Sequence, residues 1–223
     1  MILQAPSPLP LFPLTGSLLL PGNYLPLNIF EPRYRSMVAD AMEGERHIGM
    51  IQPFVPRQDN WPALDAPPEN PELYRVGCAG RIERCEPQAD GRYLILLKGV
   101  CRFRLRRELS LERGYRRGEV DYQEFALDWQ ETDNPLSPER TLSALRRFGK
   151  AHELDLDYDL LGSLPGVSLV NGLAVALPFL PAEKQALLEA PDPEARQDLL
   201  LTLMDMGLGP TTPEGYYAPP TLN

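Results

Sequence analysis

The stretch that decides the fold is residues 26–34, which read PLNIFEPRY. Its first half is apolar and predicts a strand, in which Pro26 indicates an edge position or a bulge. Its second half predicts the start of a helix, because Pro32 suits a first helical turn, where its missing N–H costs nothing. Glu31 stands at the helix N-terminus, where the helix dipole and free N–H groups favour a carboxylate. The stretch therefore predicts a strand that runs directly into a helix.

The helix predicted from this corner extends over residues 31–43 and ends before Gly44, a residue that commonly follows a helix. Apolar side chains recur along it every three or four positions, which gives one buried face. These side chains are Tyr34, Met37, Val38, Ala41 and Met42. Two interpretations of the corner remain open, because the same residues could organise the core or form a contact surface for a partner. The residues of that surface would be Phe30, Glu31, Arg33 and Tyr34.

The rest of the first 134 residues reads as strands joined by turns. β-like runs occupy residues 9–14, 24–30, 47–52, 73–86, 92–107 and 115–125, and residues 17–20 are a further candidate strand. No regular alternation of strand and helix accompanies them, which favours antiparallel pairing in a curled sheet or barrel. A proline-rich loop over residues 53–71 contains Trp61, either as an anchor packed inward or as an exposed binding aromatic.

The composition changes after Pro135. Helix start signals then recur at Ser137, Ser168, Pro181 and Asp192. We therefore predict an α+β fold in three parts. A β-rich domain covers residues 1–134, a helical subdomain covers residues 135–207, and a tail covers residues 208–223.

Composition narrows the function classes. The 223 residues carry a formal net charge of −9 at pH 7, and an acidic chain is repelled by nucleic acid and anionic lipid unless a local patch reverses the sign. The three cysteines form no CxxC pair, which fits reduced, buried thiols. No segment reads as a signal peptide or as a membrane span. We therefore expect a cytoplasmic protein with no membrane partner.

Basic residues concentrate in one segment. Residues 73–118 hold twelve Lys and Arg against five Asp and Glu, a local balance of +7. Within it Arg102, Arg104 and Arg106 alternate with apolar residues, so the two-residue period of a strand puts the three arginines on one face. This arginine stripe predicts a surface for anions, acidic peptides or nucleic acid. The alternative is a solvated face paired with acidic groups from the helical half.

Motifs for catalysis and cofactor binding are missing from the sequence. There is no G-x-x-x-x-G-K-[ST] for phosphate and no G-x-S-x-G for an acyl-transfer serine. The cysteine spacing does not suit zinc, and Asp155, Asp157 and Asp159 lack the glycine and glutamate of a calcium loop. We assign His47 and His152 ordinary structural or surface roles. We therefore expect no catalytic residue, no metal, no cofactor and no enzymatic activity.

Four segments together resemble the opening of the Lon protease N-terminal domain. In order and spacing they are LFPL at residues 11–14, LPG at 20–22, PLNIFEPRY at 26–34 and IGM at 48–50. Residues 77–82 and 94–103 resemble it more loosely, and the whole resemblance covers about residues 8–205. It implies a PUA-like antiparallel β pseudo-barrel with one early helix, followed by a C-terminal helical bundle. In Lon this domain helps to recognise unfolded or tagged substrates and helps the hexamer to assemble, while an ATPase and a peptidase follow it.

The resemblance implies a non-catalytic protein- or peptide-binding module without the ATPase or peptidase. Its partners would be unfolded or tagged polypeptide clients and a separate protease, and the oligomeric state is not predicted. The candidate contacts are Phe30, Glu31, Arg33, Tyr34, Trp61, Arg102, Arg104 and Arg106. The alternative is RNA binding through the PUA-like barrel and its arginine-rich strand face, which would show steep salt dependence.

Overall fold

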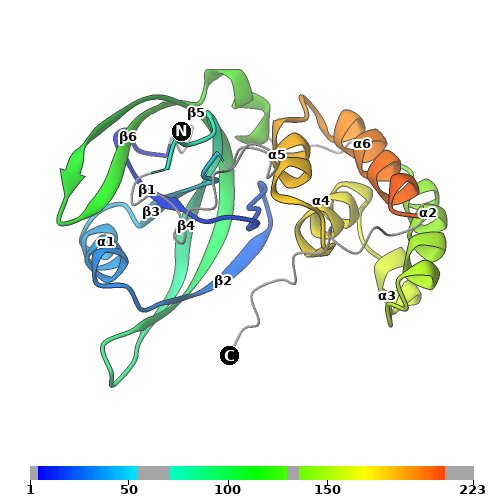
Figure 1. Ribbon diagram of the computed structural model, residues 1–223, viewed down its shortest axis with the longest axis horizontal. Helices are drawn as coiled ribbons and strands as arrows, with labels where there is room; N and C mark the ends of the chain where they lie inside the picture. Colours follow the sequence, from blue (N-terminus) through cyan, green and yellow to red (C-terminus); the bar gives the residue numbers. More distant parts are fainter. Residues whose placement is uncertain (1–4, 55–70, 130–135, 209–223) are drawn as a thin grey trace, which may run out of the picture. The chain divides into compact units, whose positions relative to one another are not determined.

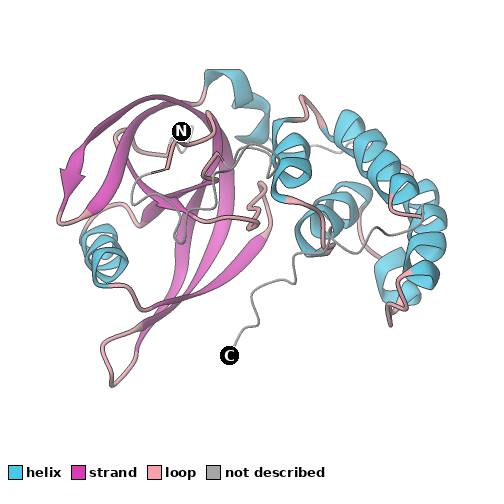
Figure 2. Ribbon diagram, in the orientation of Figure 1, coloured by secondary structure: helices cyan, strands magenta, loops and turns pink. Residues whose placement is uncertain are grey.

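The computed structural model describes residues 5–54, 71–129 and 136–208. The chain divides into two compact units (Figure 1). The first comprises Met1–Thr15 and Tyr24–Trp129, and the second comprises Gly16–Asn23 and Gln130–Asn223. Figure 2 shows the strands gathered in the first unit. The predicted boundary at residue 134 lies outside the described residues, as does all of the predicted tail except Leu208.

The first unit is built on six strands. These are β1 (Leu9–Pro13), β2 (Tyr24–Ile29), β3 (His47–Ile51), β4 (Val76–Pro87), β5 (Tyr93–Glu112) and β6 (Tyr115–Asp121). Their order in the sheet is β2-β5-β4-β3-β1-β6, and β5 also pairs with β6. This extra pairing closes five strands into a ring, and β2 lies outside the ring at an edge. The early helix α1 (Pro32–Glu43) connects β2 to β3.

The long strand β5 makes the closure possible. Its first part pairs with β2, its second part pairs with β6, and β4 runs along the other side of its first twelve residues. The β4–β5 and β5–β6 ladders each contain two register shifts, which let strands bend and twist. The curled sheet of the predicted fold class is thereby confirmed.

One pairing differs from the antiparallel prediction. The pair β1–β3 is parallel, whereas the other five pairings are antiparallel. Parallel neighbours need a long crossover connection. Here β2 and α1 supply it, because both lie between β1 and β3 in the chain.

The core of the first unit surrounds Phe103, which is fully buried on β5. Its ring lies against Gly77 of β4, directly opposite in the ladder, and against Gly49 of β3. A Cβ atom on Gly77 would lie 2.4 Å from Phe103 Cζ and 2.5 Å from the Met50 carbonyl oxygen. The two glycines are therefore needed because the aromatic ring crosses directly over their backbone.

Gly77→Ala is expected to lower the free energy of unfolding by about 1–3 kcal/mol, because the added methyl overpacks the core against a backbone carbonyl that cannot give way. Urea denaturation followed by fluorescence measures the change. Gly172→Ala is the matched control. Gly172 lies in a helix with nothing within 4 Å of its added Cβ, so the same substitution should be neutral or stabilising there. Equal stabilities of the two variants would contradict the packing argument.

The second unit contains five helices among the described residues. These are α2 (Pro138–Ala151), α3 (Tyr158–Gly162), α4 (Gly166–Ala176), α5 (Pro181–Glu189) and α6 (Pro193–Met206). The predicted starts at Ser137, Pro181 and Asp192 are confirmed, and the Asp192 carboxylate accepts a hydrogen bond from Ala195 N as a cap. The prediction that Ser168 caps a helix is wrong, because α4 begins at Gly166.

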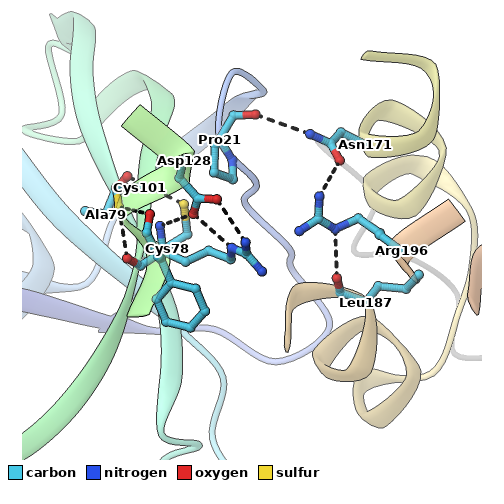
Figure 3. Close-up of polar contacts among 10 residues, drawn as sticks. Pro21, Cys78, Ala79, Cys101, Asp128, Asn171, Leu187 and Arg196 are labelled. Carbon is cyan, nitrogen blue, oxygen red and sulfur yellow. Dashed lines mark hydrogen bonds and ion pairs between the residues drawn. The ribbon is translucent and has the colours of Figure 1, made fainter. Parts of the chain in front are cut away.

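The segment Gly16–Asn23 forms no strand, so the candidate strand at residues 17–20 is wrong. It belongs to the second unit, with Leu18, Leu19 and Leu20 almost fully buried. Asn171 Nδ2 of α4 donates a hydrogen bond to the Pro21 carbonyl oxygen at 3.4 Å (Figure 3). Buried apolar side chains and this bond therefore hold an N-terminal segment in the helical unit.

None of the helices in the described ranges combines the length and the apolar character that crossing a bilayer requires.

Candidate functional site

The first arginine of the predicted stripe is part of the core. Arg102 is 3% exposed, and its guanidinium binds the Asp128 carboxylate through two hydrogen bonds of 2.9 Å. The Arg102 backbone N–H donates to the same carboxylate at 2.9 Å. The Phe125 ring lies 4.6 Å beneath the guanidinium carbon. Figure 3 draws Asp128 with the hydrogen bonds that its carboxylate accepts from the Arg102 guanidinium. The prediction of a solvated face is therefore wrong for Arg102.

The two other arginines of the stripe also have carboxylate partners. Arg104 binds Glu124 with distances of 2.5 and 2.6 Å, and Arg106 binds Asp121. The hydrogen bond from Arg104 holds the pKa of Glu124 below its usual value. The hydrogen bond from Arg106 likewise lowers the pKa of Asp121. These carboxylates come from the end of β6 and the 3-10 helix η2 (Gln123–Trp129), not from the helical half as predicted. The stripe is a set of ion pairs within the first unit.

The strand-to-helix corner divides between packing and exposure. Tyr34 is 7% exposed, and its ring lies 4.3 Å from that of Phe12. Burial raises the pKa of Tyr34. Arg33 pairs with Glu31 at 2.9 Å, and its guanidinium carbon lies 4.6 Å from the centre of the Tyr34 ring. Phe30, in contrast, is 63% exposed. Tyr34 therefore belongs to the core, whereas Phe30 is left exposed. Trp61 lies outside the described residues.

The edge strand β2 supplies exposed apolar groups that the sequence reading did not assign to a site. Tyr24 at its start is 52% exposed. Directly paired residues share a face of an antiparallel sheet, and Pro26 opposite Leu96 and Asn28 opposite Leu94 therefore lie on the same face as Tyr24. Leu94 is 43% exposed. Phe30 follows the strand directly. The available signal was Pro26, which indicated an edge.

The free side of β2 has no backbone partner among the described residues. The strand pairs only with β5 there. Prolines in edge strands place their nitrogen on the unpaired side. With the two-residue period of a strand, the backbone groups of Tyr24 and Asn28 face the same free edge as Pro26. The site thus combines an open row of hydrogen-bonding groups with an adjacent apolar face.

The cysteines have structural positions. Cys78 and Cys101 are buried on neighbouring strands, as predicted, and their thiols lie near the Ala79 and Phe125 carbonyl oxygens at 3.6 and 3.4 Å (Figure 3). Burial raises the pKa of Cys101 to about 12 and that of Cys78 well above its usual value. Such thiols stay protonated and are poor nucleophiles. Cys85 is half-buried. Within the described ranges, no three metal-binding side chains come together.

Comparison with known protein families gives one match. The model described as the ATP-dependent protease La (LON) substrate-binding domain matches residues 8–206. This chain is 26% identical over 212 residues to Lon protease 2 of Myxococcus xanthus, covering 90% of this chain and 24% of that protein. It is 31% identical over 198 residues to Lon protease 2 of Syntrophobacter fumaroxidans, covering 85% of this chain and 23% of that protein. The chain thus spans about a quarter of the length of these relatives.

Solved structures agree with the sequence comparison. The crystal structure of a Lon N-terminal domain protein from Xanthomonas campestris matches with a TM-score of 0.60 and 28% identity, and the match covers 88% of this chain and 98% of that one. The N-terminal domain of the Mycobacterium avium complex Lon protease shares the fold, with a TM-score of 0.60 at 19% identity. With the family model covering almost all of the described residues, the chain belongs to the family of the ATP-dependent protease La (LON) substrate-binding domain.

Proposed function

We propose that this chain is a non-catalytic protein-binding module that holds extended, apolar stretches of unfolded or tagged polypeptide at the free edge of β2. The observation that carries the proposal is the open β2 edge beside exposed Tyr24, Leu94 and Phe30. An extended client can add a strand to such an edge, where main-chain hydrogen bonds give affinity and alternate side chains give selectivity.

Pro26 in this edge allows a client strand to bind but opposes the pairing of β2 edges between copies of the protein. Pro26 offers a carbonyl but no N–H, so a client strand paired to β2 meets one missing donor in its ladder. Proline in an edge strand also discourages edge-to-edge pairing between copies of a protein. The edge is therefore suited to weak, reversible binding of many sequences.

The family gives the context for this binding. The matched family model describes a substrate-binding domain, and the curated relatives described above are named Lon protease. We therefore assign unfolded or tagged polypeptides as clients, a separate Lon-type protease as the partner that receives them, and the cytoplasm as the location. The RNA-binding alternative depended on the arginine stripe, whose arginines are paired with Asp121, Glu124 and Asp128.

Client binding is tested with a permanently unfolded probe, reduced and carboxymethylated α-lactalbumin carrying a fluorophore. The double variant Tyr24→Ser/Phe30→Ser is expected to bind it about tenfold more weakly in fluorescence anisotropy, because two exposed aromatic anchors are lost. Leu160→Ser is the matched control, since Leu160 is 60% exposed on the helical unit. All the variants should keep their melting temperature, because exposed substitutions cost little.

Strand addition itself is tested at one backbone position. Tyr24→Ala removes only the ring, whereas Tyr24→Pro also removes the N–H on the free edge, and proline is tolerated at the first residue of a strand. We expect Tyr24→Pro to bind the probe more weakly than Tyr24→Ala. Equal affinities would exclude strand addition. Failure of the unaltered protein to bind any unfolded probe would overturn the function as a whole.

A further inference from the structure

The outer face of the sheet beside β2 has a charged side chain in the same row as Tyr24. Tyr24 pairs with Lys98 of β5, and Lys98 pairs in turn with Arg81 of β4. Directly paired residues share a face of an antiparallel sheet. In the adjacent row Leu97 and Ile82 are almost fully buried. The row of Tyr24 therefore points to the opposite, outer face, where the Arg81 side chain is 54% exposed.

Lys98 is the single charged residue in the paired parts of the two strands nearest the open edge. Residues 24–29 of β2 read YLPLNI and carry no charge, and residues 93–98 of β5, which pair with them, read YLILLK. The Lys98 Nζ lies 5.8 Å from the centre of the Tyr24 ring. The side chain thus extends from β5 toward β2 and holds its charge over the aromatic ring at the edge.

The carboxylates on this face leave Lys98 without an ion pair in the described part of the chain. Glu83 is within 3.7 Å of Arg81, so it is paired on β4 and not on β5. Glu86 lies two rows further along the β4–β5 ladder, beyond the row of Arg84. Cations therefore occupy the Tyr24 end of the face, and the remaining acidic group lies toward the other end.

This arrangement reverses the sign of the chain locally. The whole chain carries a formal net charge of −9, which repels acidic partners unless a local patch is positive. A client strand added to β2 would lie about 4.8 Å from it. A carboxylate of that strand beside Tyr24 can approach the Lys98 ammonium over the ring, whereas a basic side chain in the same place is repelled by it.

We propose that the β2 edge selects apolar client segments that carry an acidic residue at the end next to Tyr24, where the carboxylate pairs with Lys98. This inference rests on the proposed function and names the class of client that the same site prefers. The preference is one-sided, because Lys98 lies at only one end of β2. A Glu at the matching end of a client segment raises affinity, and a Lys there lowers it.

The test uses unlabelled peptides that compete with the fluorescent carboxymethylated α-lactalbumin for the full chain. All share an apolar core of about seven residues and are acetylated and amidated, which removes the terminal charges. The reference peptide has Gln at both ends, and two others have Glu at one end or the other. We expect one of the two Glu peptides to bind about threefold to fivefold more tightly than the reference.

Two measurements on the same peptides check that this gain is electrostatic. Lys in place of the favoured Glu should bind more weakly than the reference. Raising NaCl from about 0.05 M to about 0.5 M should remove most of the difference between Glu and Gln, because salt screens exposed charges. A preference for Glu that is unchanged at high salt would contradict an ion pair with Lys98.

Variants at one position assign the preference to Lys98. Lys98→Gln should bind the Glu and Gln peptides with equal affinity, whereas Lys98→Arg keeps the charge and should keep the preference. Lys150→Gln is the matched control, because Lys150 is exposed on α2 in the second unit, and it should discriminate like the unaltered chain. A preference that persists in Lys98→Gln would overturn the assignment.

Failure of this inference is distinguishable from failure of the proposed function. If the reference peptide displaces the probe but neither Glu peptide, or both equally, binds more tightly, the one-sided acidic preference is wrong and strand addition at β2 stands. If no peptide displaces the probe, the proposed site is wrong and the inference is overturned with it.

Discussion

Asp128→Ala is expected to lower the free energy of unfolding of the first unit by about 3–5 kcal/mol. The substitution removes the partner of Arg102, whose side chain is 4% exposed, and leaves a buried cation without its carboxylate. It also removes the acceptor of the Arg102 backbone N–H. Urea denaturation followed by tryptophan fluorescence measures the change, because Trp129 lies directly beside Asp128 in η2.

Two comparisons separate a buried pair from an exposed one. Glu124→Ala removes the partner of Arg104, whose side chain is 36% exposed, and should cost at most about 1 kcal/mol. Arg102→Met/Asp128→Leu replaces both charges by apolar side chains and should recover most of the loss, because neither charge then remains buried alone. A loss in Asp128→Ala no larger than in Glu124→Ala would show that the buried pair contributes little.

The strand-to-helix corner could be predicted from the sequence because its signals are local. Pro32 lies at the start of α1, and β2 ends at Ile29, as the residue types at 26–34 indicate. Proline restricts its own backbone and that of the preceding residue, so neither choice depends on distant contacts. Pro26 likewise placed β2 correctly at an edge.

The arginine stripe shows where a local pattern is insufficient. The two-residue period correctly alternates arginines with buried Cys101, Phe103 and Leu105. It cannot tell whether another segment covers the arginine face, and η2 provides Asp128, which lies 26 residues downstream of Arg102. The long-range contact therefore makes Arg102 part of the core, whereas the side chains of Arg104 and Arg106 stay 36% and 59% exposed.

The segment Gly16–Asn23 depends on a still more distant contact. Its leucines resemble a short strand because strands and buried extended segments share the same apolar composition. Their actual environment is the helical unit, where Asn171 lies 150 residues away from Pro21 in the chain. No local signal distinguishes these two outcomes.

This distant contact makes the second unit sensitive to one buried arginine. Arg196 of α6 is 3% exposed, and it donates to the Leu187 carbonyl oxygen at 2.9 Å and to Asn171 Oδ1 at 3.0 Å (Figure 3). The Asn171 side chain then donates from its nitrogen to Pro21. Arg196 therefore orients the amide that holds Gly16–Asn23, and it links α4, α5 and α6 in the same network.

Arg196→Met is expected to destabilise the second unit by about 2–4 kcal/mol, because two buried acceptors lose their donor while the side-chain volume is largely kept. Hydrogen exchange read by mass spectrometry should show faster exchange in residues 16–23 as well as in α4 and α6. Arg140→Met is the matched control, since Arg140 is 60% exposed and pairs with Asp198 on the surface, where the same change should cost less than about 1 kcal/mol. Faster exchange in α6 with no change in residues 16–23 would mean that buried leucines alone hold this segment, and that the Asn171 amide does not depend on Arg196.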